Sequence, residues 1–218
     1  MTRRPTRSFV PFLTYVVLFH VAWAAWPFFV YPRLRSIGEA TLVYAVVNLS
    51  IRVLVWVVPV VVYLRRVDHV GALDYLKLTS HVRRGLAVGA VLTVLNLIGS
   101  IARFGMPHPS LARVTWNSLL GTSLLVGVIE ETPYRGFMLQ KFAERLGFWR
   151  ANLITSLLFL LVHVPGWIAL HSLRAGTAVT IFVFGVVMSV AFRYSNSLWA
   201  PIVAHSTNDF LSFVVFRL

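Results

Sequence analysis

Residues Leu119–Leu139 read LLGTSLLVGVIEETPYRGFML, an apolar run that contains two adjacent glutamates. A helix of about 20 such residues is long enough to cross the hydrocarbon core of a bilayer. An ionisable side chain at that depth costs on the order of 3 kcal/mol, so it is found mainly where it meets a partner or lines a cavity. Glu130 and Glu131 therefore indicate a functional site inside the membrane. The acid and histidine side chains that accompany them in later apolar stretches are His163, His205 and Asp209.

The composition is that of an integral membrane protein. Hydrophobic residues make up 58% and charged residues 12% of the 218 residues, and the mean hydropathy is +0.77. A soluble domain has roughly half apolar and a quarter charged residues. We expect an all-α, polytopic transmembrane bundle of about seven spans (six to eight), formed by one membrane domain, 1–218, with a polar intramembrane cavity.

The predicted spans follow one another with short connections. The first comes after three arginines, as the apolar part of a signal peptide would. It stays apolar up to Val30 and leads into further spans, so we interpret it as a retained anchor. The spans are residues 8–31, 41–64, 85–104, 116–140, 151–170, 177–194 and 198–216.

Charge and cysteine content exclude several classes of function. The chain has no cysteine, so it has no disulfide framework, thiol nucleophile or cysteine-ligated metal site. Its formal net charge is +13, but the basic residues are spread over the connections and do not form one face with interleaved aromatic residues. We therefore expect contacts with membrane lipid and no nucleic-acid partner, and the oligomeric state is left open.

The basic residues predict an orientation in the membrane. The N-terminus carries Arg3, Arg4 and Arg7, and the connections after the second and fourth spans are also rich in arginine and lysine. Because basic segments stay in the cytoplasm, the N-terminus is predicted to be cytoplasmic. With seven spans, the C-terminus lies on the other side.

Three of the candidate residues share one depth in this orientation. At 1.5 Å per helical residue, each lies roughly 16 to 20 Å from the cytoplasmic side. Separate helices would therefore bring them to one level of the membrane. The separations along the chain are 11 residues from Glu130 to Lys141, 13 from Arg150 to His163 and 12 from Arg193 to His205.

Local spacing indicates charged pairs. Glu131 and Arg135 stand at positions i and i+4 on one helical face, as do His205 and Asp209. We expect Glu131 and Arg135 to form a structural ion pair. Glu130 points about 100° away from Glu131 and has no local cation, which makes it the candidate general base.

The residue types favour hydrolysis. Glutamate and histidine together can activate water, and histidine can stabilise the oxyanion that forms when water attacks a carbonyl. The sequence has neither the Gly-x-Ser-x-Gly turn of a serine nucleophile nor the His-Glu-x-x-His helix of soluble zinc proteases. Any metal would therefore need ligands from separate helices. His20, alone in its apolar segment, is interpreted as a histidine that bonds to neighbouring backbone.

Two other classes of function could use the same residues. In a proton-coupled transporter the glutamates and histidines would form a proton relay, but the inverted repeats typical of such carriers are not evident. A non-catalytic protein, such as a peptide-toxin immunity or scaffold protein, would tolerate the loss of Glu130 but not the loss of packing.

The motifs resemble those of a known family. The run Glu130–Gly136 (EETPYRG), the segment Phe159-x-x-x-His163 and the run Asn196–Asp209 (NSLWAPIVAHSTND) are similar to the successive motifs of the CPBP family. This is the CAAX-protease and bacteriocin-processing group of intramembrane proteases, which includes the type II CAAX prenyl endopeptidases. The resemblance spans residues 115–215, the protease-like motif region.

The resemblance implies an intramembrane endopeptidase in which Glu130 and His163 activate the attacking water. His205 and Asp209 would position that water or stabilise the oxyanion. A divalent metal such as zinc would take Glu130, His163 and His205 as ligands, and a glutamate-dependent mechanism without metal is also open. The residues implied to brace the first motif helix are Glu131 and Arg135.

The resemblance also implies a membrane-associated substrate. The eukaryotic branch cuts prenylated Cys-a-a-X tails, and bacterial members act in peptide maturation and immunity to peptide toxins. A membrane-anchored or prenylated peptide or protein is the expected partner. The short, arginine-rich, cysteine-free chain favours a bacterial inner (cell) membrane.

Three residues have special positions relative to this pattern. Asp209 stands where the family usually has Asn, and an ionised Asp cannot donate a hydrogen bond, so it would be protonated, orient His205 or help hold a cation. Pro133 removes a backbone donor and should kink the motif helix. Arg52, midway through the second span, is expected to pair with a carboxylate of the site, with contact to the carboxyl end of a substrate as the alternative.

Overall fold

The computed structural model describes residues 9–109 and 111–216, and within these ranges it contains helices and no strands. This confirms the predicted all-α fold. The basic N-terminal residues Arg3, Arg4 and Arg7 lie outside the described residues. Within the described residues, five helical stretches are long and apolar enough to cross a membrane. They are Val10–Arg35, Leu42–Arg66, Val82–Phe104, Phe148–Ala169 and Ala175–Ser195.

The other two predicted spans, 116–140 and 198–216, are built from shorter helices. In the first, α7 (Trp116–Leu120) ends at a turn over residues 121–125 before α8 (Val126–Glu131) begins, so the segment is not one continuous helix. The turn leaves the carbonyl of Gly121 free of the helical ladder, and it accepts a hydrogen bond from Arg52. These two segments contain most of the predicted site residues.

Short π-helical turns occur in two of the long stretches and in both of the segments built from shorter helices. Pro27 and Pro133 lie in the first turns of two of them, where a residue without a backbone N–H breaks the regular ladder. The helices of the five long stretches are α1 (Val10–Ala25), η1 (Trp26–Val30), α2 (Tyr31–Arg35), α3 (Leu42–Arg52), η2 (Val53–Val57), α4 (Val58–Arg66), α6 (Val82–Phe104), α10 (Phe148–Leu161), α11 (Val164–Ala169) and α12 (Ala175–Ser195). The remaining elements are α5 (Ala72–Tyr75), η3 (Leu111–Arg113), η4 (Thr132–Met138), α9 (Leu139–Leu146), α13 (Trp199–Phe210) and η5 (Leu211–Phe216).

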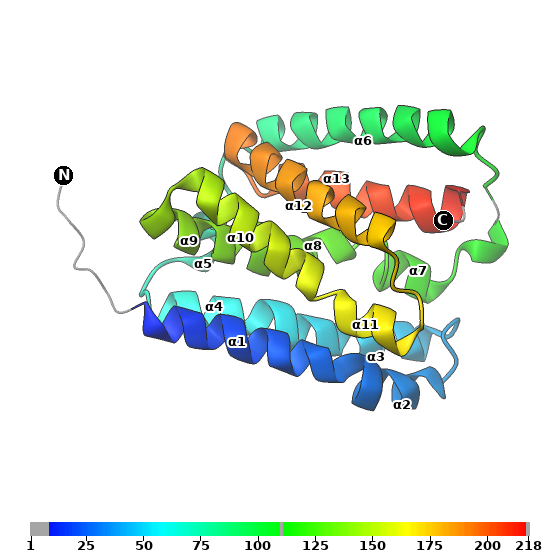
Figure 1. The fold of residues 1–218 in the computed structure, drawn as a ribbon, viewed down its shortest axis with the longest axis horizontal. Helices are drawn as coiled ribbons and strands as arrows, with labels where there is room; N and C mark the ends of the chain where they lie inside the picture. Colours follow the sequence, from blue (N-terminus) through cyan, green and yellow to red (C-terminus); the bar gives the residue numbers. More distant parts are fainter. Residues whose placement is uncertain (1–8, 110, 217–218) are drawn as a thin grey trace.

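The helices with the site motifs occupy the middle of the bundle. Figure 1 shows α6 along one edge and α1 and α4 along the opposite edge, with α8 and α13 between them. The α6 and α13 helices approach closely because α6 has glycine at the contact: a Cβ on Gly89 would lie 2.7 Å from the Cβ of Val203. Glycine at Gly127 likewise lets α8 approach the backbone of α13. The two central helices are therefore held at short distance by small residues, as is usual in membrane bundles.

Aromatic side chains fill the core between α1, α4 and the motif helices. Phe12 packs edge-on against Phe137, with ring centroids 5.6 Å apart, and Tyr134 does the same with Phe159 at 5.0 Å. All four side chains are buried. Such pairs stabilise the fold beyond the burial of apolar area, and they fix the position of η4 along α1 and α10.

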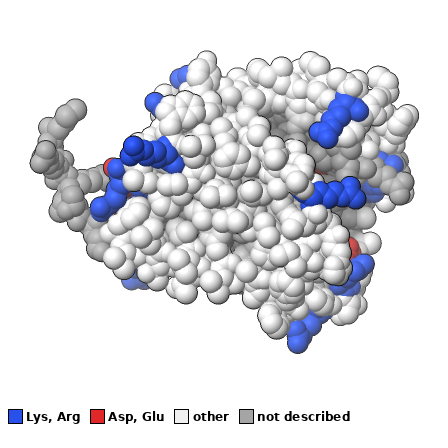
Figure 2. Space-filling model, viewed as in Figure 1, with Lys and Arg blue, Asp and Glu red and all other residues white. Residues whose placement is uncertain are grey.

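One end of the bundle gathers the more basic connections. Lys77 binds Asn196 between the α5–α6 and α12–α13 connections, and Lys141 of α9 pairs with Asp68 at 2.7 Å. Figure 2 shows lysine and arginine toward the ends of the molecule and an uncharged middle, as a membrane-crossing bundle requires. The described basic residues of this end are Arg65, Arg66, Lys77, Arg83, Arg84, Lys141, Arg145, Arg150 and Arg193, and those of the opposite end are Arg33, Arg35, Arg103, Arg113 and Arg174.

Candidate active site

The two glutamates lie at the end of α8, where the helix changes type. Both side chains are buried, and Pro133 follows them in the first turn of η4. Because Pro133 has no N–H to donate, the regular ladder gives way to a wider π turn, a feature often found at functional sites. Thr132 compensates locally by donating its hydroxyl to the carbonyl of Val128 at 2.6 Å. The predicted kink is thus a change to a π-helical turn.

Glu131 connects three helical elements through one carboxylate. Its Oε2 lies 3.0 Å from Nη1 of Arg135, the predicted ion pair, and its Oε1 lies 2.6 Å from Nδ1 of His205 on α13. Arg135 also donates from Nη2 to the carbonyl of Gly185 on α12 at 3.1 Å and lies over the ring of Phe159 on α10. The Glu131–Arg135 pair is fully buried, so its partners satisfy charges that would otherwise be costly in the apolar interior.

Glu130 faces a different partner, as expected for adjacent residues on a helix. Its Oε1 lies 2.6 Å from Nη2 of Arg52, whose other terminal nitrogen donates to the carbonyl of Gly121. The expected pairing of Arg52 with a site carboxylate is therefore present, although the two residues are 78 positions apart. The second oxygen of Glu130, Oε2, is buried and accepts no hydrogen bond from the described residues.

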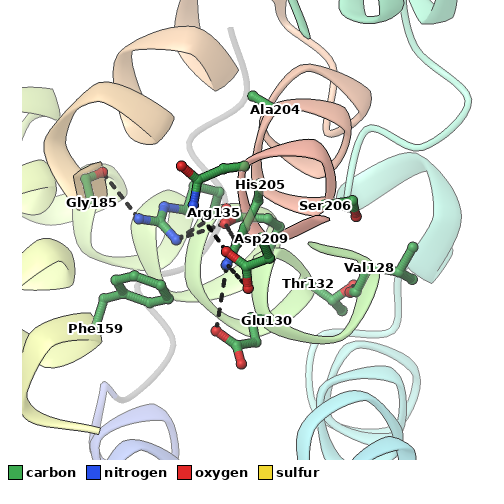
Figure 3. Close-up of polar contacts among 12 residues, drawn as sticks. Val128, Glu130, Thr132, Arg135, Phe159, Gly185, Ala204, His205, Ser206 and Asp209 are labelled. Carbon is green, nitrogen blue, oxygen red and sulfur yellow. Dashed lines mark hydrogen bonds and ion pairs between the residues drawn. The ribbon is translucent and has the colours of Figure 1, made fainter. Parts of the chain in front are cut away.

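His205 faces this second oxygen of Glu130, and Asp209 faces the same ring nitrogen of His205. Nε2 of His205 lies 3.9 Å from Oε2 of Glu130 and 3.8 Å from Oδ2 of Asp209. Because Glu131 accepts a hydrogen bond from Nδ1, Nε2 is the ring atom that faces the other two carboxylates. Figure 3 shows Glu130, His205 and Asp209 pointing toward one another. The Asp209 side chain is 20% exposed, the most accessible of the three.

His163 lies near this cluster but is not bonded to it. Its Nδ1 donates to the carbonyl of Phe159 at 2.7 Å, and no polar contact among the described residues joins it to Glu130 or His205. The ring of Phe159 contacts both imidazoles, with centroids 4.9 Å from His163 and 5.9 Å from His205. Nε2 of His163 is left for a further partner. His20, by contrast, contacts the carbonyls of Val16 and Leu158 and the hydroxyl of Tyr134, as the backbone-bonding interpretation predicted.

Glu130, His163 and His205 are the candidate ligands for a metal whose presence the sequence leaves undecided. Within residues 9–109 and 111–216, no three His, Asp or Glu side chains are grouped as ligands of one ion. Glu130 and His205 approach each other, whereas the contacts of His163 are with the ring and carbonyl of Phe159 and the ring of Trp167. These residues therefore do not fit a three-ligand site, and the chemistry is better derived from the side chains alone.

The predicted polar cavity stays a prediction. A hollow of about 680 Å³ lies between α1 and α4, and none of the candidate site residues lines it. Its walls are mainly apolar side chains of α1, η2 and α4, including Leu18, Phe19, Leu54 and Val55. The polar cluster itself is packed between α8, α13 and α3.

The comparison with protein families gives a match that includes the residues of this cluster. The family model described as type II CAAX prenyl endopeptidase Rce1-like matches residues 112–211, which include Glu130, His163, His205 and Asp209. The matched segment is therefore similar to the Rce1-like family. The match confirms the family predicted from the motifs and, with it, intramembrane proteolysis by an integral membrane protein. Neither a curated protein nor a solved structure matches the chain.

The Rce1-like match does not reach Arg52, which lies outside the matched segment. The sequence drew attention to it because an arginine in the middle of an apolar span needs a partner. Asn208, which donates from Nδ2 to Oδ1 of Asp209 at 2.9 Å, was not singled out. Its position next to Asp209 was the available signal.

Proposed function

We propose that this Rce1-like chain hydrolyses a peptide bond in a membrane-anchored polypeptide, of which a prenylated Cys-a-a-X tail is the substrate class to test first. The family description names a prenyl endopeptidase, and the chain offers its acid and imidazole groups inside a largely apolar bundle. A lipid-linked peptide can reach such a site sideways from the bilayer. The observation that supports this function most directly is the convergence of Glu130, His205 and Asp209 at Nε2 of His205.

Glu130 is proposed as the general base. Its Oε2 is buried and accepts no hydrogen bond from the described residues, so it can accept a proton from a water held beside Nε2 of His205. As that proton moves to Glu130, the water oxygen bonds to the carbonyl carbon of the scissile peptide. The C–N bond then breaks, and Glu130 returns the proton to the leaving amine.

His205, Asp209 and His163 are proposed to act on the water and the oxyanion. His205 is held by Glu131 at Nδ1, so the ring cannot turn away from the reaction. Asp209 lies next to Nε2, the ring nitrogen that Glu131 does not bind, and positions the same water. His163 has Nε2 available and would reach the substrate carbonyl once a peptide lies between it and Glu130.

A glutamate-dependent reaction is the form of the mechanism that these side chains support. The cluster lacks a trio of ligands among the described residues, and Glu130 is bound by a guanidinium at one oxygen. The proposal therefore predicts that a strong chelator leaves cleavage by the purified protein unchanged. Loss of activity that added zinc restores would show instead that a metal is needed.

The experiment uses the full chain, purified and placed in lipid vesicles, with three peptides of one sequence. The first ends in farnesylated Cys-a-a-X, the second in unmodified Cys-a-a-X, and the third carries a transmembrane anchor without a lipid. Parent protein is compared with Glu130→Gln, His205→Gln and His163→Ala at equal amounts. Glu39→Gln, which changes a carboxylate of the α2–α3 connection outside the site, is the matched control.

We expect the parent to cleave the farnesylated peptide, and Glu130→Gln to lower kcat/KM by about 100-fold to 10,000-fold, the range for losing a general base. Glu39→Gln should leave cleavage unchanged. No cleavage of any peptide by the parent, or equal cleavage by Glu130→Gln, would refute the proposed function. Cleavage of the anchored peptide alone would keep the endopeptidase and reject the prenylated substrate.

A further inference from the structure

The α6 helix presents a row of polar side chains toward α13. It is one of the apolar stretches able to cross a membrane, yet Thr93, Asn96 and Ser100 lie on the side that contacts α13. Polar side chains in the hydrocarbon region are costly unless they find partners, and those that persist often serve a function. The α6 helix lies outside the family match.

A chain of hydrogen bonds leads from this row to the candidate active site. The hydroxyl of Ser100 donates to Oδ1 of Asn96 at 3.1 Å, and Nδ2 of Asn96 donates to Oδ1 of Asn208. Nδ2 of Asn208 in turn donates to Oδ1 of Asp209 at 2.9 Å. Every bond points its donor toward Asp209.

The chemistry of the last member sets this direction. An ionised carboxylate can only accept hydrogen bonds, so Asn208 must turn its NH₂ group toward Asp209 and its oxygen toward α6. Asn96 must then donate to that oxygen. Once Oδ1 of Asp209 is occupied in this way, Oδ2 is the oxygen left for His205, 3.8 Å from Nε2.

We propose that Asn96 is a positioning residue for the reaction, which acts through Asn208 to hold Asp209 as a carboxylate aimed at His205. The inference rests on the proposed function and extends it to a helix outside the motif region. The close contact of Gly85 and Gly89 with α13 keeps Asn96 in register with Asn208.

The same helix pair provides a matched control. Thr93 is one turn before Asn96 on α6, and its hydroxyl lies 2.6 Å from that of Thr207 on α13. This pair spans the same interface, but none of its hydrogen bonds reaches Asp209. Thr93→Val therefore removes one polar contact between α6 and α13 without touching the chain to the site.

The first measurement compares Asn96→Leu and Thr93→Val with the parent in the farnesyl-peptide assay. Asn96→Leu should lower kcat about tenfold, the scale on which an outer hydrogen-bond partner acts on a reactive group, and leave KM near the parental value. Thr93→Val should leave both constants within about twofold. Thermal unfolding in detergent identifies any loss of fold. If Asn96→Leu fails to fold, Asn208→Leu breaks the chain from the α13 side and replaces it.

The second measurement combines Asn96→Leu with Asp209→Ala, which removes the oxygen that accepts from Asn208. If Asn96 acts through the carboxylate of Asp209, its effect on kcat should largely disappear in the Asp209→Ala background, because coupled residues are not additive. The inference would be overturned if the effects of the two changes simply multiplied, or if Asn96→Leu and Thr93→Val lowered kcat equally. The proposed function would stand in either case, provided that cleavage still depends on Glu130. Cleavage that does not depend on Glu130 would overturn both.

Discussion

Arg52 and Glu130 show at the scale of single residues how one contact serves stability and chemistry together. Each side chain is 9% exposed, and the guanidinium occupies one carboxylate oxygen while the other faces His205. Breaking such a buried pair on one side leaves an uncompensated charge, which costs about 3–5 kcal/mol in proteins. We therefore expect Arg52 to compensate the buried charge of Glu130 and to orient its second oxygen toward His205.

Replacing Arg52 tests this role. Arg52→Gln should lower the unfolding temperature in detergent and reduce cleavage more than tenfold, whereas Arg52→Lys, which keeps the charge, should retain more of both. The control is Arg35→Gln, which breaks an exposed pair with Glu39 worth at most about 1 kcal/mol. Equal behaviour of Arg52→Gln and Arg35→Gln would contradict the assignment.

At the scale of elements, the Glu131–Arg135 pair ties η4 to α10, α12 and α13. Either single change, Glu131→Leu or Arg135→Met, should destabilise the fold because it leaves the other charge buried without a partner. The double variant should recover thermal stability, since apolar side chains can replace a buried pair. It should not recover cleavage, because His205 then lacks its acceptor at Nδ1. Recovery of cleavage with stability would show that Glu131 does not orient His205.

The separation of α8 and α13 sets whether Glu130 and His205 can meet. A Cβ on Gly127 would lie 2.6 Å from Oγ of Ser206 and clash with the backbone carbonyl of Ile202, so Gly127→Ala must push α8 away from α13. We expect cleavage to fall at least tenfold, whereas the unfolding temperature should change only slightly. Gly99→Ala on α6, where a Cβ meets nothing within 4 Å, is the control and should leave cleavage unchanged. Full activity of Gly127→Ala would mean that the site does not depend on this approach.

At the scale of the whole molecule, the uneven distribution of arginine and lysine predicts the orientation. The α5–α6 connection lies at the more basic end and the α11–α12 connection at the other, so the first is expected in the cytoplasm and the second outside. The chain has no cysteine, so single cysteines can be introduced as labels. In intact bacterial cells, Ser172→Cys should react with a membrane-impermeant thiol reagent, and Thr79→Cys should react only after lysis. The opposite labelling pattern would reverse the predicted topology.

Local sequence patterns are enough to predict several contacts of the site. Glu131 with Arg135, and His205 with Asp209, are i,i+4 pairs whose meeting depends on helical geometry alone. The different directions of Glu130 and Glu131 follow from the same geometry. Whether a metal is bound was left undecided by the sequence, with Glu130, His163 and His205 as candidate ligands, and no group of three such side chains is found among the described residues.

Hydropathy and helical period act over a few residues, so local sequence is enough to predict a helical membrane protein with acids and histidines in its apolar segments. Which of these groups touch depends on the packing of separate helices. Arg52 meets Glu130, Glu131 meets His205, and Asn96 meets Asn208 across separate helices. Such contacts depend on how closely the helices pack. Small residues such as Gly89 and Gly127 permit a close approach, but no local pattern specifies which helices approach each other.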